Sequence, residues 1–206
     1  MSEAPRAVRL QSVGSTQDVA RELPIGSVVV ADHQTAGRGR LSRTWEAPPG
    51  SGLNASFVLK ASPLLSLAAG VAAAQACGPA VRLKWPNDLL LGERKLGGIL
   101  IEVSGQKAVV GIGINLKWAP PGAARLGIPR DQLLADLQRL LDRWASAPAP
   151  EVLTAWRALS DTIGRRVRVE LADRVLEGMA EDVDENGSLV VDGVPVSAGD
   201  VIHLRT

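Results

Sequence analysis

An Arg/Gly-rich stretch of residues 33–52, called the Arg/Gly loop below, carries the strongest chemical signal in the sequence. Its charged and flexible members are Gly37, Arg38, Gly39, Arg40 and Arg43. Guanidinium groups make forked, charge-assisted hydrogen bonds to phosphate or carboxylate oxygens, and glycine lets the backbone approach a ligand closely. The loop is therefore suited to wrapping an anion. A flexible solvated loop or a nonspecific RNA contact explains such a cluster equally well, so this loop alone leaves the function open.

A second candidate segment runs from Lys84 through Trp85, Pro86, Asn87 and Asp88, and Lys95, Gly97 and Gly98 follow it. Pro86 forces a turn at the end of a strand and presents Asn87 and Asp88 at its tip. An amide can read a base or amide edge, and a carboxylate can accept from a ligand or hold a metal-bound water. Lys95, facing glycines that have no side chains, has room to lie beside a charged ligand. Each residue alone is more often a turn cap or a solvated lysine.

A third segment, Gly111 to Asn115, ends an apolar strand. Glycine weakens a strand interior unless something must approach the backbone closely. Asn115 could then donate to phosphate oxygens. A β-bulge is the preferred explanation of this segment when the other two are not considered.

The elements that must position these segments alternate between helices and strands. Helices are predicted at residues 15–23, with Ser15 as N-cap, and at 64–77, 131–144 and 151–159. Strands are predicted at residues 27–31, 54–60, 81–85, 89–91, 96–103 and 107–116. From Ile163 onward short alternating strands, joined by Asn-Gly and Asp-Gly hairpin turns, indicate a small β-barrel. The sequence thus predicts an α+β unit over residues 1–160 and a β unit over residues 161–206.

Composition narrows the function classes. The 206 residues carry 23 Lys and Arg against 22 Asp and Glu, a formal net charge of +1, so no strong overall field attracts nucleic acid or anionic lipid. Any anion site must be local. The start of the chain has no apolar signal region and the longest apolar stretch is interrupted by polar residues and glycine, so neither export nor membrane insertion is expected. Cys77, the only cysteine, cannot form an internal disulfide, which fits a cytoplasmic enzyme. His33 and His203 lack neighbouring ligand residues, and no His or Cys metal site is assigned.

Taken together and in this order, the three segments resemble the catalytic domain of biotin protein ligases. The matching stretches are Ser15 and Thr16, Gln34 to Arg43, Trp45, Pro49 to Leu53, KWPNDLLL with KLGGILIE, and GIGIN. The likeness runs from about Val8 to the C-terminus, because IGRRVRVE, DENGSLVV and HLR resemble the small SH3-like end domain of that family. The resemblance implies a class II synthetase-like fold with a mixed or antiparallel sheet, packed helices and a C-terminal SH3-like β-barrel.

The resemblance also implies an activity. Such an enzyme forms biotinyl-5'-AMP from biotin and ATP, with Mg²⁺ carried on the ATP phosphates, and transfers biotin to a lysine of a biotin carboxyl carrier protein domain. The catalytic residues would be Lys95, Arg40 and Arg38. The biotin-binding residues would be Ser15, Thr16, Gln17, Gln34, Gly37, Arg38, Gly39, Arg40, Trp45, Lys95, Gly97 and Gly98. The nucleotide-binding residues would be Arg38, Arg40, Arg43, Trp45, Asn87, Asp88, Lys95 and Asn115.

Three positions depart from the family pattern. Gln17 stands where asparagine is expected, Ser42 where the loop usually has glycine, and Asn54 where an aromatic residue is common. Gln17 keeps amide chemistry, so biotin binding is expected to survive, whereas Ser42 is expected to stiffen the loop. The chain starts only a few residues before the catalytic domain, which predicts a ligase without a DNA-binding repressor domain.

Other functions stay open at this point. A lipoate-type ligase has a similar fold and adenylation chemistry and differs in the acid it activates. A nucleic-acid-binding module could also combine an Arg/Gly loop with a β-barrel, but barrels that bind single strands usually present aromatic stacking residues, and no Trp, Phe or Tyr follows Ile163. A protein that binds biotin without transferring it is a third alternative. The resemblance also admits a homodimer formed by edge-to-edge sheet pairing, and it implies neither a nucleic acid nor a membrane partner.

Overall fold

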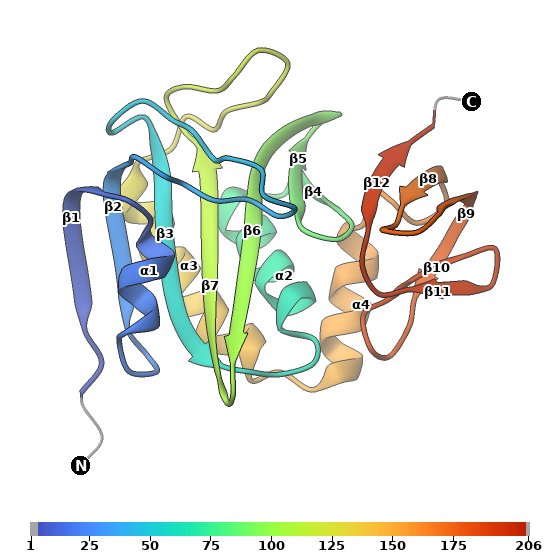
Figure 1. Cartoon of the computed structure of the whole chain (residues 1–206), viewed down its shortest axis with the longest axis horizontal. Coiled ribbons are helices and arrows are strands. Elements are labelled where there is room, and N and C mark those ends of the chain that lie inside the picture. The colour runs from blue at the N-terminus through green and yellow to red at the C-terminus, as the bar shows by residue number, and fades with distance from the viewer. Residues whose placement is uncertain (1–3, 205–206) are drawn as a thin grey trace.

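A seven-stranded sheet forms the centre of the protein, whose computed structural model describes residues 4–204 (Figure 1). In spatial order its strands are β1 (Ala7–Val13), β2 (Val28–Gln34), β3 (Gly52–Lys60), β7 (Lys107–Asn115), β6 (Arg94–Ser104), β5 (Asp88–Leu91) and β4 (Val81–Lys84). The β1–β2 pair is parallel and every other neighbouring pair of this sheet is antiparallel. The predicted mixed or antiparallel sheet is confirmed.

Three helices cover one face of this sheet: α2 (Leu65–Cys77), α3 (Arg130–Ala145) and α4 (Ala149–Leu159). The helix α2 is apolar on nearly every side because it packs between the sheet and the other two helices, and its alanines permit that close packing. The α3 helix instead buries one stripe of leucines and Trp144, as its sequence spacing predicts. The main hydrophobic core therefore lies on this face of the sheet.

The opposite face carries the short helix α1 (Thr16–Arg21) and only a small apolar cluster of Ala20, Val29, Val58 and Val109. Along β3 the residues alternate between the faces, as strand geometry requires. Leu53, Ala55, Phe57 and Leu59 belong to the main core, so Asn54, Ser56 and Val58 point toward the α1 face. Buried polar residues on a strand that is otherwise apolar mark this face as the place for a binding site.

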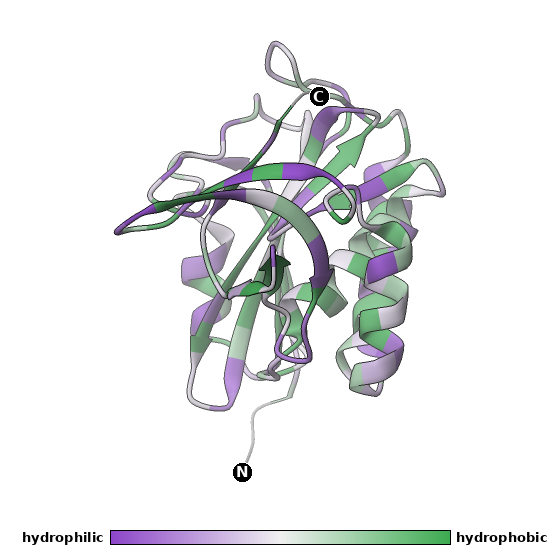
Figure 2. Ribbon diagram, turned by 90° about the vertical axis from the view of Figure 1, so that its right-hand side faces the viewer, coloured by the Kyte–Doolittle hydropathy of each residue, from purple (hydrophilic) through white to green (hydrophobic). Residues whose placement is uncertain are grey.

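The C-terminal unit is a five-stranded antiparallel sheet of β8 (Arg166–Glu170), β9 (Val175–Val183), β10 (Leu189–Val191), β11 (Val194–Val196) and β12 (Asp200–His203), in the order β11-β10-β9-β8-β12. Hydrophilic and hydrophobic residues alternate along β8 and are interspersed along the longer β9 (Figure 2). This sheet packs against the larger unit, because Trp85 Nε1 donates to Gly187 O at 3.1 Å and Arg157 pairs with Asp182. One hydrophobic core continues through both units. The division at residues 160 and 161 stays a prediction.

Most predicted elements agree with the structure to within a few residues. The strand β1 is an exception, because no strand was predicted before Ser15. Asp88 begins β5 and does not lie at the tip of the preceding turn. Within residues 4–204 we find no helix of the length and apolar character needed to cross a membrane.

Candidate active site

A pocket lies on the α1 face of the sheet, between α1, the Arg/Gly loop, the turn after β4 and the strand β12. Predicted site residues that line it are Ser15, Thr16, Gln17, Gln34, Arg38, Gly39, Arg40, Arg43, Trp45, Asn87, Asp88, Lys95 and Gly98. The three segments singled out in the sequence therefore meet at one place.

The floor of the pocket is a row of residues that face each other across four strands. Asn54 on β3 pairs with Gly113 on β7, which pairs with Gly98 on β6, which pairs with Asp88 on β5. The two central positions have no side chains, so the row is hollow in the middle. A Cβ atom at Gly113 would lie 2.5 Å from Trp45 Cε2, so this glycine makes room for the indole ring. The sequence pattern of glycines inside a strand thus reflects close approach of side chains and not a bulge at these positions.

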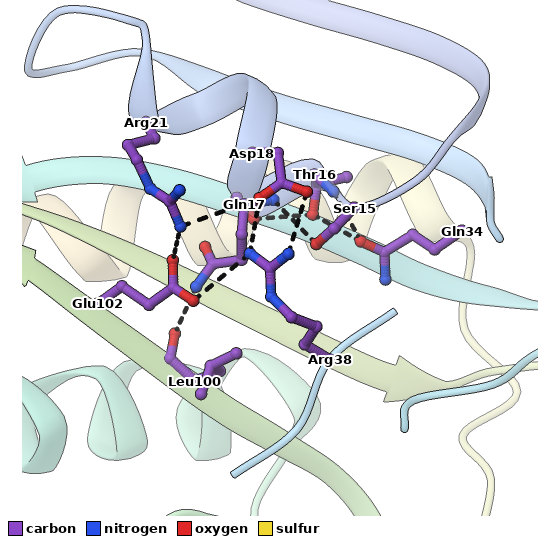
Figure 3. Close-up of polar contacts among 10 residues, drawn as sticks. Ser15, Thr16, Gln17, Asp18, Arg21, Gln34, Arg38, Leu100 and Glu102 are labelled. Carbon is purple, nitrogen blue, oxygen red and sulfur yellow. Dashed lines mark hydrogen bonds and ion pairs between the residues drawn. The ribbon is translucent and has the colours of Figure 1, made fainter. Parts of the chain in front are cut away.

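A polar network lies at the α1 end of the pocket (Figure 3). Ser15 caps α1 and its hydroxyl accepts from Gln17 N at 3.3 Å. Thr16 donates from its backbone N and from Oγ1 to Gln34 Oε1, at 2.8 and 3.0 Å, and Thr16 Oγ1 also lies 2.7 Å from Ser56 Oγ. The side chains of Ser15, Thr16 and Ser56 are almost completely buried. These hydroxyl groups are fixed in place before any ligand binds.

Gln17 adds a buried acceptor that has no partner. Its Nε2 donates to Leu100 O at 3.3 Å, and this contact fixes which amide atom is the nitrogen, because a flipped amide would set two oxygens against each other. Within residues 4–204, Gln17 Oε1 and Arg168 Nε are the buried side-chain polar atoms without a hydrogen-bond partner. A Cβ at Gly111 would lie 3.1 Å from the Gln17 amide carbon, so the glycine makes room for it. An unsatisfied buried acceptor costs about 1–3 kcal/mol.

Arg38 is held by carboxylates of the protein and ties the Arg/Gly loop to the sheet (Figure 3). Both of its terminal nitrogens donate to Asp18, at 3.0 and 2.8 Å, and one also reaches Glu102 at 3.4 Å. Arg21 donates to the same Glu102 at 2.7 Å. The hydrogen bond with Arg38 holds the pKa of Asp18 below its usual value. In this structure the Arg38 guanidinium therefore anchors the loop to α1 and β6. Its contact with a ligand stays a prediction.

Arg40 and Arg43 connect the loop to two further parts of the pocket. Arg40 donates to Asn87 Oδ1 at 3.3 Å, and its burial lowers the pKa of its guanidinium. Arg43 forms an ion pair with Asp200 on β12, whose hydrogen bond raises the pKa of Arg43. The C-terminal unit thus contributes a wall of the pocket. Arg40 is the loop arginine whose guanidinium bonds a neutral amide here, which leaves its charge available to an anion.

Lys95 reaches the pocket from β6 and is partly exposed. Its Nζ donates to Asp88 Oδ1 at 2.6 Å. The neighbouring Gly98 is open to it, because a Cβ there would lie 3.6 Å from Lys95 Nζ. The predicted free space beside Lys95 is therefore present, with one carboxylate partner.

Trp45 closes the base of the Arg/Gly loop. Its backbone N donates to Gly37 O at 2.9 Å, and Gly39 N donates to Arg43 O at 2.7 Å, so residues 37–45 form a small hairpin. Leu41 and Ser42 lie at the hairpin tip with φ of 52° and 59°. This is the left-handed region that favours glycine. Ser42, where the family pattern has glycine, therefore sits in backbone geometry that glycine would adopt with less strain.

Three predicted site residues do not line the pocket. Gly37 lies under Trp45, where a Cβ would be 2.2 Å from Trp45 O. Gly97 packs against Gly113 O, and Asn115 Nδ2 donates to Ala124 O at 3.0 Å. These residues hold the loop, the sheet and the segment after β7 in their places.

Several residues that line the pocket were not predicted as site residues, and they include Asn54, Ser56, Gly111, Asp200 and Val201. The sequence does contain a signal for Asn54 and Ser56, because these polar residues stand at alternate positions of an otherwise apolar strand. No sequence signal points to Asp200, since it lies 157 positions from its partner Arg43.

The two histidines lie outside the pocket lining. His203 Nε2 lies 3.1 Å from Thr162 Oγ1, and burial, reinforced by Lys84, lowers its pKa to about 4. Among the residues that the structure describes, no group of three or more His, Cys, Asp or Glu side chains is placed to hold a metal ion.

Comparisons with known proteins agree with this geometry. The biotin/lipoate A/B protein ligase family matches residues 9–118, and the biotin protein ligase C-terminal domain matches residues 162–204. The sequence is 38% identical over 213 residues to biotin–acetyl-CoA-carboxylase ligase of Mycobacterium tuberculosis, which covers 87% of this chain and 80% of that protein. It is 32% identical over 220 residues to the bifunctional ligase/repressor BirA of Escherichia coli, with 90% of this chain and 68% of that protein covered. The structure of biotin protein ligase from Aquifex aeolicus in complex with biotin and ATP superimposes with a TM-score of 0.83, at 27% identity, over 98% of this chain and 99% of that one.

Proposed function

The chain belongs to the biotin/lipoate A/B protein ligase family, and we propose that it is an ATP-dependent biotin protein ligase. It forms biotinyl-5'-AMP from biotin and ATP. It then transfers biotin to the ε-amine of a lysine in a biotin carboxyl carrier protein domain. The Mycobacterium tuberculosis relative carries a ligase activity on biotin in its name, and the solved relative contains biotin and ATP.

The unpartnered Oε1 of Gln17 is the observation that favours biotin over lipoate. The ureido ring of biotin has two N–H donors and a carbonyl acceptor, whereas the dithiolane ring of lipoate has only two weakly accepting sulfurs. The α1 end of the pocket offers hydroxyl groups at Ser15 and Thr16 beside this acceptor. A ligand with N–H groups would satisfy it, but a dithiolane would leave it unpaired at a cost.

The first chemical step follows from charge. A biotin carboxylate oxygen attacks the α-phosphorus of ATP, the bond from that phosphorus to the bridging oxygen breaks, and pyrophosphate leaves. Attack of one anion on another is slow unless cations neutralise both. Lys95 and Arg40 line the pocket and supply that positive charge at fixed positions.

Mg²⁺ is expected to arrive with ATP, because magnesium usually keeps water ligands and binds one or two carboxylates together with substrate phosphates. Asp88 is a pocket carboxylate that fits this use, although it is paired with Lys95 here. When bound, the ion would add positive charge at the phosphates. The lining contains no dedicated protein cage for it.

The second step requires that water stays out. The mixed anhydride reacts with the neutral acceptor amine, which bonds to the carbonyl carbon, loses a proton and expels AMP. Water would destroy the same intermediate. The Arg/Gly loop crosses the pocket and is fastened to α1, Asn87 and β12, so it is suited to covering the adenylate.

The internal pairing of the loop weighs against the nucleic-acid alternative. Arg38 and Arg43 are bound to Asp18 and Asp200, so their charge is largely neutralised by the protein itself. We further propose a carrier domain as partner, a cytoplasmic location, which fits the single buried thiol of Cys77, and the predicted homodimer.

Intact mass of a carrier domain after incubation with biotin, ATP and Mg²⁺ tests the proposed function. One added biotinyl group is expected. A parallel assay measures pyrophosphate exchange into ATP with biotin or lipoate as the acid. Exchange that depends on lipoate and not on biotin would overturn the assignment, as would salt-sensitive oligonucleotide binding without any mass gain.

A further inference from the structure

The indole ring of Trp45 sits on the floor row of the pocket, over Gly113 and beside Asn54. Trp45 Nε1 donates to Asn54 Oδ1 at 3.1 Å. Asn54 and Gly113 are direct partners in the β3–β7 pairing, so the acceptor and the space for the ring come from one register position. Asn54 and Gly113 therefore form a recess in the sheet, called the seat below, that accommodates this side chain of the loop.

The seat is fixed by the sheet, and the ring that occupies it belongs to a loop. Asn54 is only 3% exposed and lies in the middle of the sheet, on a strand that is paired on both sides. Trp45 closes the hairpin of residues 37–45, so its position sets the position of the whole hairpin. An indole N–H that is buried without an acceptor is costly. Removing the Asn54 acceptor should therefore favour conformations in which the hairpin leaves the pocket.

We infer that Asn54 is a positioning residue, which acts through Trp45 to hold the Arg/Gly loop closed over the pocket. In the enzymatic cycle, which rests on the proposed function, this contact keeps the adenylate covered until the acceptor amine arrives. Asn54 itself need not touch the reacting atoms. It acts by fixing the ring that covers them.

The two ion pairs that attach the loop differ from this contact in kind. The Arg38–Asp18 and Arg43–Asp200 pairs have side chains that are 30–61% exposed, and exposed ion pairs contribute little and weaken with salt. The Trp45–Asn54 bond joins two uncharged groups and is insensitive to salt. It should therefore hold the loop at high ionic strength, when the ion pairs are screened.

Limited proteolysis of the ligand-free full chain tests the positioning role without any assumption about activity. Trypsin should cleave after Arg38, Arg40 and Arg43 faster when the loop opens, because proteolysis needs a locally unfolded backbone. Arg174 in the β8–β9 turn is an internal reference remote in sequence. In Asn54→Ala, loop cleavage relative to Arg174 should rise about 5- to 30-fold, the factor expected for one lost buried hydrogen bond. The increase should persist in 0.5 M NaCl, roughly three times physiological ionic strength.

A double-mutant cycle separates the hydrogen bond from a general loss of structure. Trp45→Phe removes the N–H donor and retains a ring, so it should open the loop to a similar extent. Adding Asn54→Ala to Trp45→Phe should then change cleavage by less than about 2-fold, because the bond is already absent. Additive effects of the two substitutions, or unchanged loop cleavage in Asn54→Ala, would overturn the inference. Thermal unfolding of each variant shows whether the fold is retained.

The catalytic consequence is measured as AMP released per biotin attached to the acceptor. In the parent chain this ratio should be near one. In Asn54→Ala it should rise several-fold, because an uncovered adenylate is lost to water before transfer. Faster loop cleavage with an unchanged ratio would refute the role in retaining the intermediate. If the parent chain releases no biotin-dependent AMP at all, the proposed function fails while the proteolysis result still decides the loop contact.

Discussion

The substitution Gln17→Met should weaken biotin binding without lowering the stability of the ligand-free protein. Methionine matches glutamine in length and is at home in a buried position. In the ligand-free protein the substitution removes the bond to Leu100 O, worth about 1 kcal/mol, and also removes an unsatisfied acceptor that costs about 1–3 kcal/mol. The free energy of unfolding should therefore change by less than about 1 kcal/mol, or rise.

Biotin binding should respond in the opposite way. In the Gln17→Met protein a ureido N–H would be buried without a partner, and the loss of about 1.4–2.7 kcal/mol corresponds to a Kd raised about 10- to 100-fold. Titration calorimetry with biotin measures this change, and urea unfolding of the ligand-free protein measures stability.

A matched control uses the same substitution outside the pocket. Gln75 on α2 accepts from Trp144 Nε1 at 2.9 Å, so Gln75→Met breaks a satisfied hydrogen bond. It should lower stability by up to about 1 kcal/mol and leave the Kd for biotin unchanged. A Gln17→Met protein that unfolds more than about 2 kcal/mol more easily while binding biotin normally would refute the argument from the orphaned acceptor.

Three further outcomes follow from the site and its surroundings. Lys95→Ala should slow biotin-dependent pyrophosphate exchange about 100-fold or more, as for loss of a preorganised cation, and unchanged exchange would remove Lys95 from the mechanism. The lowered pKa of His203 means that the unfolded chain binds the proton more tightly, so this contribution to stability is present above pH 6.5 and is lost as the pH falls toward 4. Urea unfolding between pH 7 and 4 should show a loss of stability, at most about 3 kcal/mol because His203 is only partly buried, beyond the loss in His203→Gln, and parallel curves for the two proteins would contradict it. Gly113→Ala should displace Trp45 and speed trypsin cleavage of the loop, because the added Cβ would lie 2.5 Å from the indole, whereas an unaltered cleavage rate would show that the ring has another place to go.

Local patterns predicted the elements, and the order of motifs predicted which of them build the site. The helix at residues 64–77 and the strand at 107–116 were readable because their apolar content is high and glycine or proline ends the helix. The strand β1 was missed because it lies at the sheet edge and is mostly exposed, so its sequence lacks a buried face.

Contacts between distant charged residues were not predictable from one sequence. Arg38 looked like a ligand-binding residue because its loop is rich in arginine, yet its partners Asp18 and Glu102 lie 20 and 64 positions away. Nothing in local spacing distinguishes an arginine that waits for an anion from one already paired with a carboxylate. Asp200 shows the same limit, since only the docking of β12 brings it to the pocket.

Two glycines of β7 beside the pocket have a consequence for how ligand choice can change over time. Gly111 and Gly113 already have the smallest side chain that exists, and each space is filled by a neighbour, Gln17 or Trp45. Substitution at either glycine can only take room away. At these two spaces, room for a larger acid can therefore come only from smaller residues at positions 17 and 45. A side chain at position 111 or 113 would instead narrow the pocket and exclude acids that now fit.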